Sequence, residues 1–165
     1  METEPKNYTL KVFDLNSNNI TEHNLKVSRG LHKTNGNVIW NIQFDFQGNL
    51  IESTNLHFLS QSINKIREIV EPKGFRILVK CSDYDAAHSG MQADMTAGTQ
   101  IYKMNKLNEK GNPVSYDVLT ESDINSVVSL AEQMKNRENT IRELKTAHNR
   151  TLQKEEKKWW QKFFK

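Results

Sequence analysis

The chain has 165 residues, of which 36% are hydrophobic and 26% are charged, and its formal net charge is +3. This length suits one domain with an appended element, and the apolar residues are patterned well enough to exclude a disordered chain. The last twelve residues hold five lysines and two glutamates, which accounts for the whole net charge. The remainder is balanced, which does not favour nucleic-acid binding, because nucleic-acid binders usually spread a basic face over the fold.

Cysteine content and hydropathy set further limits. Cys81 is the single cysteine, so the chain forms no internal disulfide and no zinc site that needs paired cysteines. No apolar run typical of a signal peptide follows Met1, and no stretch of 18 apolar residues could span a membrane. The sequence therefore predicts a protein of the reducing cytoplasm.

The first part of the chain alternates in the manner of β-strands. After residues 1–7, which we expect to form a flexible N-terminus, the pattern predicts strands over 8–12, 24–28 and 38–46. Asn35-Gly36 is typical of a tight hairpin turn before the third strand. That strand has one apolar face, made of Val38, Trp40, Ile42, Phe44 and Phe46. Its opposite face is largely polar, as expected of a sheet that covers a core on one side.

An amphipathic helix is predicted over residues 54–71. Its apolar residues fall at helical spacing: Leu56, Leu59, Ile63, Ile66 and Val70. Pro72 and Gly74 are expected to end the helix, and its apolar side is expected to pack on the sheet. Residues 75–81 follow as an apolar run, which predicts an interior strand.

A short helix is predicted over residues 89–97, with a capping box at Ser89 and Gln92 and a C-terminal cap at Gly98. Strands are predicted over 99–104 and 114–119. From Ser122 the pattern predicts a helix to the end of the chain.

That C-terminal helix has two parts with different patterns. Its first part carries a firm apolar stripe: Ile124, Val127, Val128, Ala131 and Met134. The stripe becomes sparse and charged beyond Met134. We therefore expect an α+β domain over 8–135, in which an antiparallel or mixed sheet packs against an amphipathic helix. A long charged helical extension over 136–165 is expected to follow it.

Residues 81–98 concentrate groups that small-molecule chemistry uses. Cys81 could act as a nucleophile with His88 as base, oriented by Asp83 or Asp85. Asp83, Asp85, His88 and Asp94 could hold a metal ion, although their spacing matches no standard zinc or calcium pattern. The simplest interpretation is a connection between a strand and a helix. In it, Cys81 is an inert core residue, and Ser89 caps a helix that turns Met91 and Met95 to the core.

An anion site is the remaining alternative for this stretch. Backbone N–H groups at a helix N-terminus attract phosphate or carboxylate, and Ser89 and Gly90 stand at the predicted terminus, with His88 before them. Asp83 and Asp85 would repel such a ligand, and no glycine-rich phosphate motif is present. These five residues are the predicted ligand-binding site, and no catalytic residue, metal or cofactor is predicted.

The last nine residues, KKWWQKFFK, set two aromatic pairs among lysines. On a helix, Trp159, Trp160 and Phe163 share one side, with Phe164 at its edge. Such a tip can enter a groove on another protein, pair with a second copy, lie on an anionic membrane surface or fold back on its own domain. Glu155 and Glu156 weaken the membrane alternative.

The leading functional hypothesis is a non-enzymatic interaction or regulatory protein of the cytoplasm. It would dock a protein partner or form a homo-oligomer through its C-terminal helix, with the four aromatic residues of the tip as anchors. One alternative is a small-ligand or anion-binding domain, or an enzyme, that uses residues 81–98. Another is peripheral attachment to an anionic membrane through the tip.

Overall fold

A computed structural model describes most of the chain before residue 147. The described residues are 3–32, 36–87, 94–110, 113–143 and 146. They confirm the α+β class, because the strands form antiparallel sheets and helices accompany them. The chain divides into two compact units, Met1–Gln133 and Met134–Lys165.

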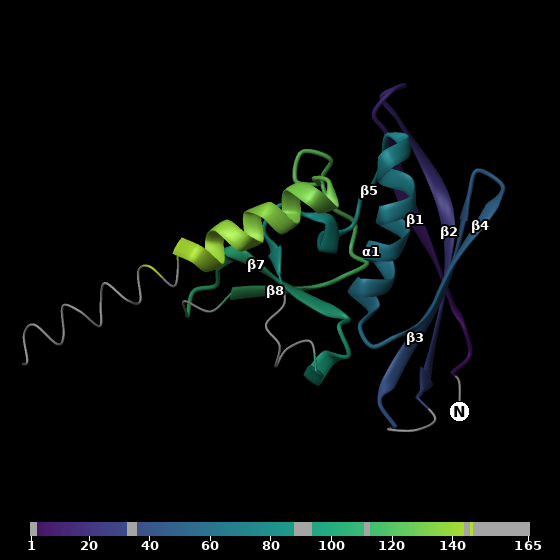
Figure 1. Ribbon diagram of the computed structural model, residues 1–165, viewed down its shortest axis with the longest axis horizontal. Helices are drawn as coiled ribbons and strands as arrows, with labels where there is room; N and C mark the ends of the chain where they lie inside the picture. Colours follow the sequence, from purple (N-terminus) through teal and green to yellow (C-terminus); the bar gives the residue numbers. More distant parts are fainter. Residues whose placement is uncertain (1–2, 33–35, 88–93, 111–112, 144–145, 147–165) are drawn as a thin grey trace, which may run out of the picture. The chain divides into compact units, whose positions relative to one another are not determined.

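The first unit is built around a curled five-stranded antiparallel sheet with strand order β4-β3-β2-β1-β5 (Figure 1). The strands are β1 (Lys6–Asp14), β2 (Asn19–Leu31), β3 (Val38–Phe46), β4 (Asn49–Leu56) and β5 (Phe75–Ile77). Strands β1 to β4 follow one another around the sheet. Asn18 and Gly48 have φ values of 57° and 74° in the β1–β2 and β3–β4 turns. The predicted strands over 8–12, 24–28 and 38–46 are confirmed, and the first two are longer than expected.

Two strands differ from the sequence-based expectation. Residues 54–56 belong to β4, where a helix was predicted, because pairing with β3 outweighs a local pattern in which Leu56 fits the helix. The predicted interior strand over 75–81 is wrong. Its three-residue part β5 lies at the edge of the sheet and pairs with β1. Leu78 and Val79 are buried all the same, and the backbone of Leu78 bonds to Lys11 on β1 and to Ser122.

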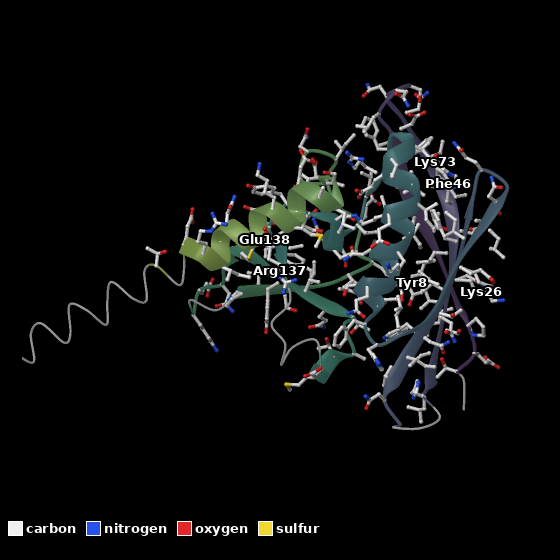
Figure 2. All side chains as sticks on the ribbon, viewed as in Figure 1. Tyr8, Lys26, Phe46, Lys73, Arg137 and Glu138 are labelled. Carbon is white, nitrogen blue, oxygen red and sulfur yellow. The ribbon has the colours of Figure 1, made fainter. Side chains whose placement is uncertain are left out.

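Helix α1 (Leu59–Val70) lies along one face of the curled sheet (Figure 1). Four aliphatic side chains of α1 are buried in the common core: Leu59, Ile63, Ile66 and Val70. Each contributes about 1.5–3 kcal/mol by leaving water. The sheet supplies the facing residues Leu10, Val12, Leu25, Val27, Ile42, Phe44 and Phe46. Figure 2 shows Phe46 among them, and exposed Lys26 on β2. The predicted amphipathic helix is confirmed, with a later start.

A second antiparallel sheet has the order β6-β7-β8. Its strands are β6 (Ala86–Ala87), β7 (Gln100–Leu107) and β8 (Pro113–Asp117). The segment after β5 bonds to β1 from Leu78 N to Lys11 O (2.9 Å) and to the turn after β8 from Lys80 N to Thr120 O (2.8 Å). Both sheets share one core, to which this part adds Ala86, Ile101 and Val118. The strands predicted over 99–104 and 114–119 are confirmed.

The expectation of a helix from Ser122 is wrong. Residues 122–129 form an irregular segment, in which Val127 makes an isolated bridge with Asp83, and the helix begins at residue 130. Its start carries a capping box. Ser129 Oγ donates to Glu132 Oε2 (2.6 Å) and accepts from Glu132 N (3.2 Å).

Two predicted helices are described only in part. The C-terminal helix is described over 130–143 and at residue 146, and the rest of the predicted extension lies outside the described residues. Of the helix predicted over 89–97, residues 94–96 are helical, and the expectation that Met95 faces the core is wrong, because this side chain is 81% exposed. The capping box predicted at Ser89 and Gln92 lies outside the described residues.

Candidate functional site

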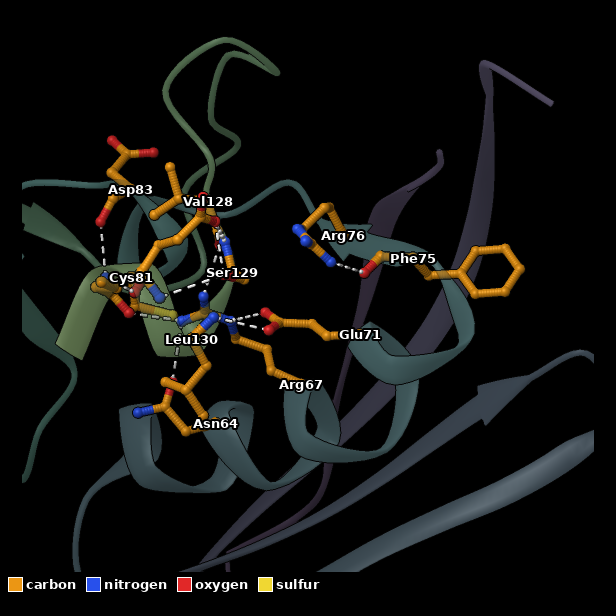
Figure 3. Close-up of polar contacts among 12 residues, drawn as sticks. Asn64, Arg67, Glu71, Phe75, Arg76, Cys81, Asp83, Val128, Ser129 and Leu130 are labelled. Atoms are coloured by element: carbon orange, nitrogen blue, oxygen red, sulfur yellow. Dashed lines mark hydrogen bonds and ion pairs between the residues drawn. The ribbon is translucent and has the colours of Figure 1, made fainter. Parts of the chain in front are cut away.

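Three polar side chains and a few backbone groups meet at a buried arginine, and we call this arrangement the Arg67 junction (Figure 3). Its side chains are Asn64, Arg67, Glu71 and Gln133. The Arg67 side chain is 0% exposed, on the same helix face as the apolar core residues. A fully buried guanidinium is stable only when its donors find acceptors, because desolvation of the charge is costly.

The guanidinium of Arg67 is satisfied on all three nitrogens. Nε donates to Glu71 Oε1 at 2.7 Å, which is also an ion pair one helical turn along α1. Nη1 donates to Gln133 Oε1 (2.7 Å) and to Asn64 Oδ1 (3.3 Å). Nη2 donates to the backbone oxygen of Val128 (2.8 Å). One side chain of α1 thereby binds both the irregular segment and the first turn of the helix that begins at residue 130.

Glu71 and Gln133 extend the junction in two directions. The second carboxylate oxygen of Glu71 accepts from Leu130 N (2.7 Å), one of the N–H groups that a helix start leaves without an intrahelical acceptor. Gln133 Nε2 donates to the backbone oxygens of Cys81 (2.8 Å) and Asp83 (2.7 Å). The base of the C-terminal helix is therefore tied both to α1 and to the start of the 81–98 stretch.

Asp83, one of the predicted ligand-binding residues, is fully buried and already paired. Its Oδ1 accepts from the hydroxyl of Ser122, and its Oδ2 lies 2.7 Å from Lys103 Nζ and 3.7 Å from Lys80 Nζ. Burial is the largest influence on the pKa of Lys103 and lowers it, but the hydrogen bond and charge of Asp83 outweigh burial and raise the pKa overall. Asp83 thus joins β7 to the segments that contain Lys80 and Ser122.

The other predicted ligand-binding residues are only partly described. Asp85 is partly buried, with Oδ1 3.8 Å from Lys103 Nζ, while His88, Ser89 and Gly90 lie outside the described residues. The anion site therefore stays a prediction. Within the part of the chain that the structure describes, no group of three or more His, Cys, Asp or Glu side chains is placed to hold a metal ion.

Cys81 occupies an apolar environment at the core. Its side chain is buried, and burial raises the pKa of the thiol from 9.0 to about 12. A nucleophilic cysteine needs exposure and a lowered pKa. Cys81 has neither property. Its burial agrees with the alternative prediction of an inert core residue.

The Arg67 junction was not predicted, although part of its signal is in the sequence. Arg67 stands four residues after Ile63 and three before Val70, so a charged residue interrupts the apolar stripe of α1. Glu71 follows at the i,i+4 distance of a helical ion pair. Gln133 is 66 positions away, and no local pattern pairs it with Arg67.

The predicted partner-binding residues Trp159, Trp160, Phe163 and Phe164 lie outside the described residues. None of the described helices has the length and apolar character needed to cross a membrane. A comparison of the chain with protein-family models gives no match, and a comparison with curated proteins gives no match.

Proposed function

We propose that this chain is a non-enzymatic interaction protein whose C-terminal helix is the docking element, with a second copy of the chain as its partner. The proposal rests on a difference in burial along the helix that begins at residue 130. Gln133, at its base, is buried in the Arg67 junction, whereas among the described residues 134–143 none is buried. A helix with little buried surface of its own depends on its anchor or on a partner.

The anchor supports this role because it fixes the first turn of the helix. A buried ion pair is a weak source of net stability, since desolvation offsets the attraction. Such networks instead favour one arrangement of the elements they join, which is the use we assign to Arg67, Glu71 and Gln133. The capping box at Ser129 and Glu132 adds a local start signal to the same turn.

The exposed part of the helix is mostly polar but carries two apolar residues, which we assign to the contact between helices. Met134 is 57% exposed and Ile141 is 41% exposed, and their spacing of seven places both on one face. Arg137 and Glu138 are exposed on the intervening turn (Figure 2), and charges of both signs suit the margin of such a contact. In the sequence this stripe continues through Leu144 to the aromatic anchors of the tip.

The aromatic tip completes the proposed interface. Trp and Phe side chains that enter a partner supply much of the energy of a protein–protein contact. We assign that role to Trp159, Trp160, Phe163 and Phe164. The single thiol, Cys81, is free, in keeping with a protein of the reducing cytoplasm.

The test replaces all four aromatic residues of the tip by alanine and measures the association state by sedimentation velocity. We expect the full chain to sediment as a dimer or larger species and the variant as a monomer with unchanged far-ultraviolet circular dichroism. The matched control replaces Lys157, Lys158, Lys162 and Lys165 by glutamine and should still associate. A monomeric full chain that pellets with anionic vesicles, and loses this with the glutamine variant, would favour membrane attachment and contradict the proposal.

A further inference from the structure

A cleft of about 590 Å³ lies in the first unit, between the start of β3, the start of α1 and the turn that ends the 81–98 stretch. Eight residues line it: Gly36, Asn37, Val38, His57, Phe58, Gln61, Asp94 and Ala97. None belongs to the Arg67 junction or to the five predicted ligand-binding residues. The volume is in the range of clefts that hold small molecules.

The wall formed by the turn is held firmly in place. Ala97 has a φ of 50°, in the left-handed region that residues with a side chain rarely adopt, and Gly98 follows at 69°. The oxygen of Ala97 accepts from Trp40 Nε1 (2.8 Å) and from Leu59 N (3.4 Å). A Cβ at Gly98 would lie 2.4 Å from Phe58 Cβ, so the turn packs directly against the start of α1. Fixing this side of the cleft lowers the ordering cost when a ligand enters.

The chemistry of the lining selects the ligand. Asp94 is the one carboxylate among the eight lining residues, and none of the eight is a lysine or an arginine. Phe58 and Val38 add an apolar surface, and Asn37 and Gln61 add amide groups. Among these eight described residues, an anion would meet the Asp94 carboxylate with the His57 imidazole as the one basic side chain, whereas an ammonium group would pair directly with that carboxylate and favour the face of an aromatic ring.

The geometry points to a binding site for a small organic amine in this cleft. The ammonium group pairs with Asp94, the apolar part lies against Phe58, and the Gln61 amide lies within the same lining. This site is independent of the docking role of the C-terminal helix, so either function can fail without the other.

Three probes of one shape and different charge test the inference: phenethylamine, phenethyl alcohol and phenylacetate. Binding to the full chain is followed by NMR shifts of the Gln61 and Gly98 amides during titration. We expect phenethylamine to bind about fivefold or more tightly than the alcohol, as an exposed ion pair with a cation–π contact allows, and phenylacetate to bind weakest.

A charge-removing variant gives the decisive comparison. Asp94→Asn should remove the preference for phenethylamine over the alcohol. Asp45→Asn is the control, since it removes an exposed carboxylate on β3 that does not line the cleft, and it should leave the preference intact. Equal binding of all three probes, shifts confined to other residues, or a preference that survives Asp94→Asn would each overturn the inference. The tip variants serve as a further check, because they should bind phenethylamine like the full chain.

Discussion

Arg67 shows how a charged side chain can be part of a core. Its guanidinium meets two side-chain amides, a carboxylate and a backbone oxygen, so its donors exchange water for protein acceptors at 2.7–3.3 Å. Removing the guanidinium would leave the Glu71 carboxylate, whose side chain is only 10% exposed, without its cation. The free-energy cost of this unpaired charge is larger than the loss of the ion-pair attraction itself.

We therefore expect Arg67→Met to lower the free energy of unfolding by about 3–5 kcal/mol. Arg67→Lys should restore only part of this loss, because an ammonium cannot reproduce the fork of the guanidinium. Arg29→Met, at an exposed position on β2, is the control and should change stability by no more than about 0.5 kcal/mol. Urea unfolding measures all three, and a loss for Arg67→Met no larger than that of the control would refute the role of the junction.

Gly48 and Gly98 are glycines for different reasons: Gly48 for its backbone conformation alone, and Gly98 also for the lack of space for a side chain. Both have a positive φ, 69° and 74°, but a Cβ at Gly98 would meet Phe58 at 2.4 Å, while a Cβ at Gly48 has nothing within 4 Å. Gly48→Ala should cost about 1–2 kcal/mol from the left-handed backbone alone. Gly98→Ala should cost about 1–3 kcal/mol more, because the extra methyl is forced into packed atoms. Thermal or urea unfolding of the two variants checks this, and equal losses would show that the turn can move away from α1.

The raised pKa of Cys81 makes stability depend on pH at the alkaline end. The thiol ionises near 9.0 in the unfolded chain but only at about 12 in the folded protein. The unfolded state therefore loses its proton first, and this contribution to stability is intact below pH 9 and is lost as the pH rises towards 12. The loss is about 1.4 kcal/mol per pH unit.

Cys81→Ala isolates this contribution from that of other alkaline groups. The stability advantage of the native chain over the variant should shrink between pH 9 and 10.5 in urea unfolding. An advantage that stays constant over this range would mean that the thiol is accessible in the folded state.

Local sequence patterns predict the strands and helices whose pattern agrees with their tertiary environment. The alternation in β3 and the helical stripe of α1 are both strong, and both elements were predicted. Leu56 fits the helical stripe, so the pattern predicts a helix over residues 54–56 of β4. Their pairing with β3 has no signal in the local sequence. The apolar run Ile77, Leu78 and Val79 predicts an interior strand, yet only Ile77 belongs to β5, and β5 lies at the edge of the sheet.

The start of the C-terminal helix was predicted at the wrong residue, although the sequence contains the correct start signal. Ser129 and Glu132 carry the spacing of a capping box, but the expectation placed the start at Ser122, where the polar run Thr120–Asp123 also resembles a cap. The apolar residues at 124, 127 and 128 fit a helical period as well. In the folded protein Ser122 instead donates to Asp83, which draws this segment away from helical geometry.

Ser129→Ala should lower the free energy of unfolding by about 0.5–2 kcal/mol, the cost of an N-cap, and Ser129→Thr should restore most of it. The cap also holds the pKa of Glu132 below its ordinary value, through the hydrogen bonds from the Ser129 hydroxyl and backbone N–H. The contribution of the Glu132 carboxylate to stability is present above pH 4.5 and is lost as the pH falls through the lowered pKa. Ser129→Ala should therefore weaken the dependence of stability on pH in acid. An unchanged acid dependence would argue against the capping box.

For the whole molecule, sequence reasoning proposes the C-terminal helix as a docking element but does not predict the Arg67 junction at its base. The aromatic tip is conspicuous in the sequence because four aromatic residues stand within six positions. The anchor is formed by Arg67, Glu71 and Gln133, which come together only when α1 and the residue 130 helix are in place. A site assembled from distant polar residues has no contiguous pattern, so sequence periodicity cannot reveal it.

We propose that the C-terminal helix is a surface for association with a second copy. Light scattering after size exclusion, on the full chain and on a chain ending at Arg150, tests it most directly. We expect the full chain to show at least twice the mass of a single chain and the shortened chain to be a monomer with the same cooperative unfolding transition. A full chain that is monomeric, or a shortened chain that associates as before, would contradict it.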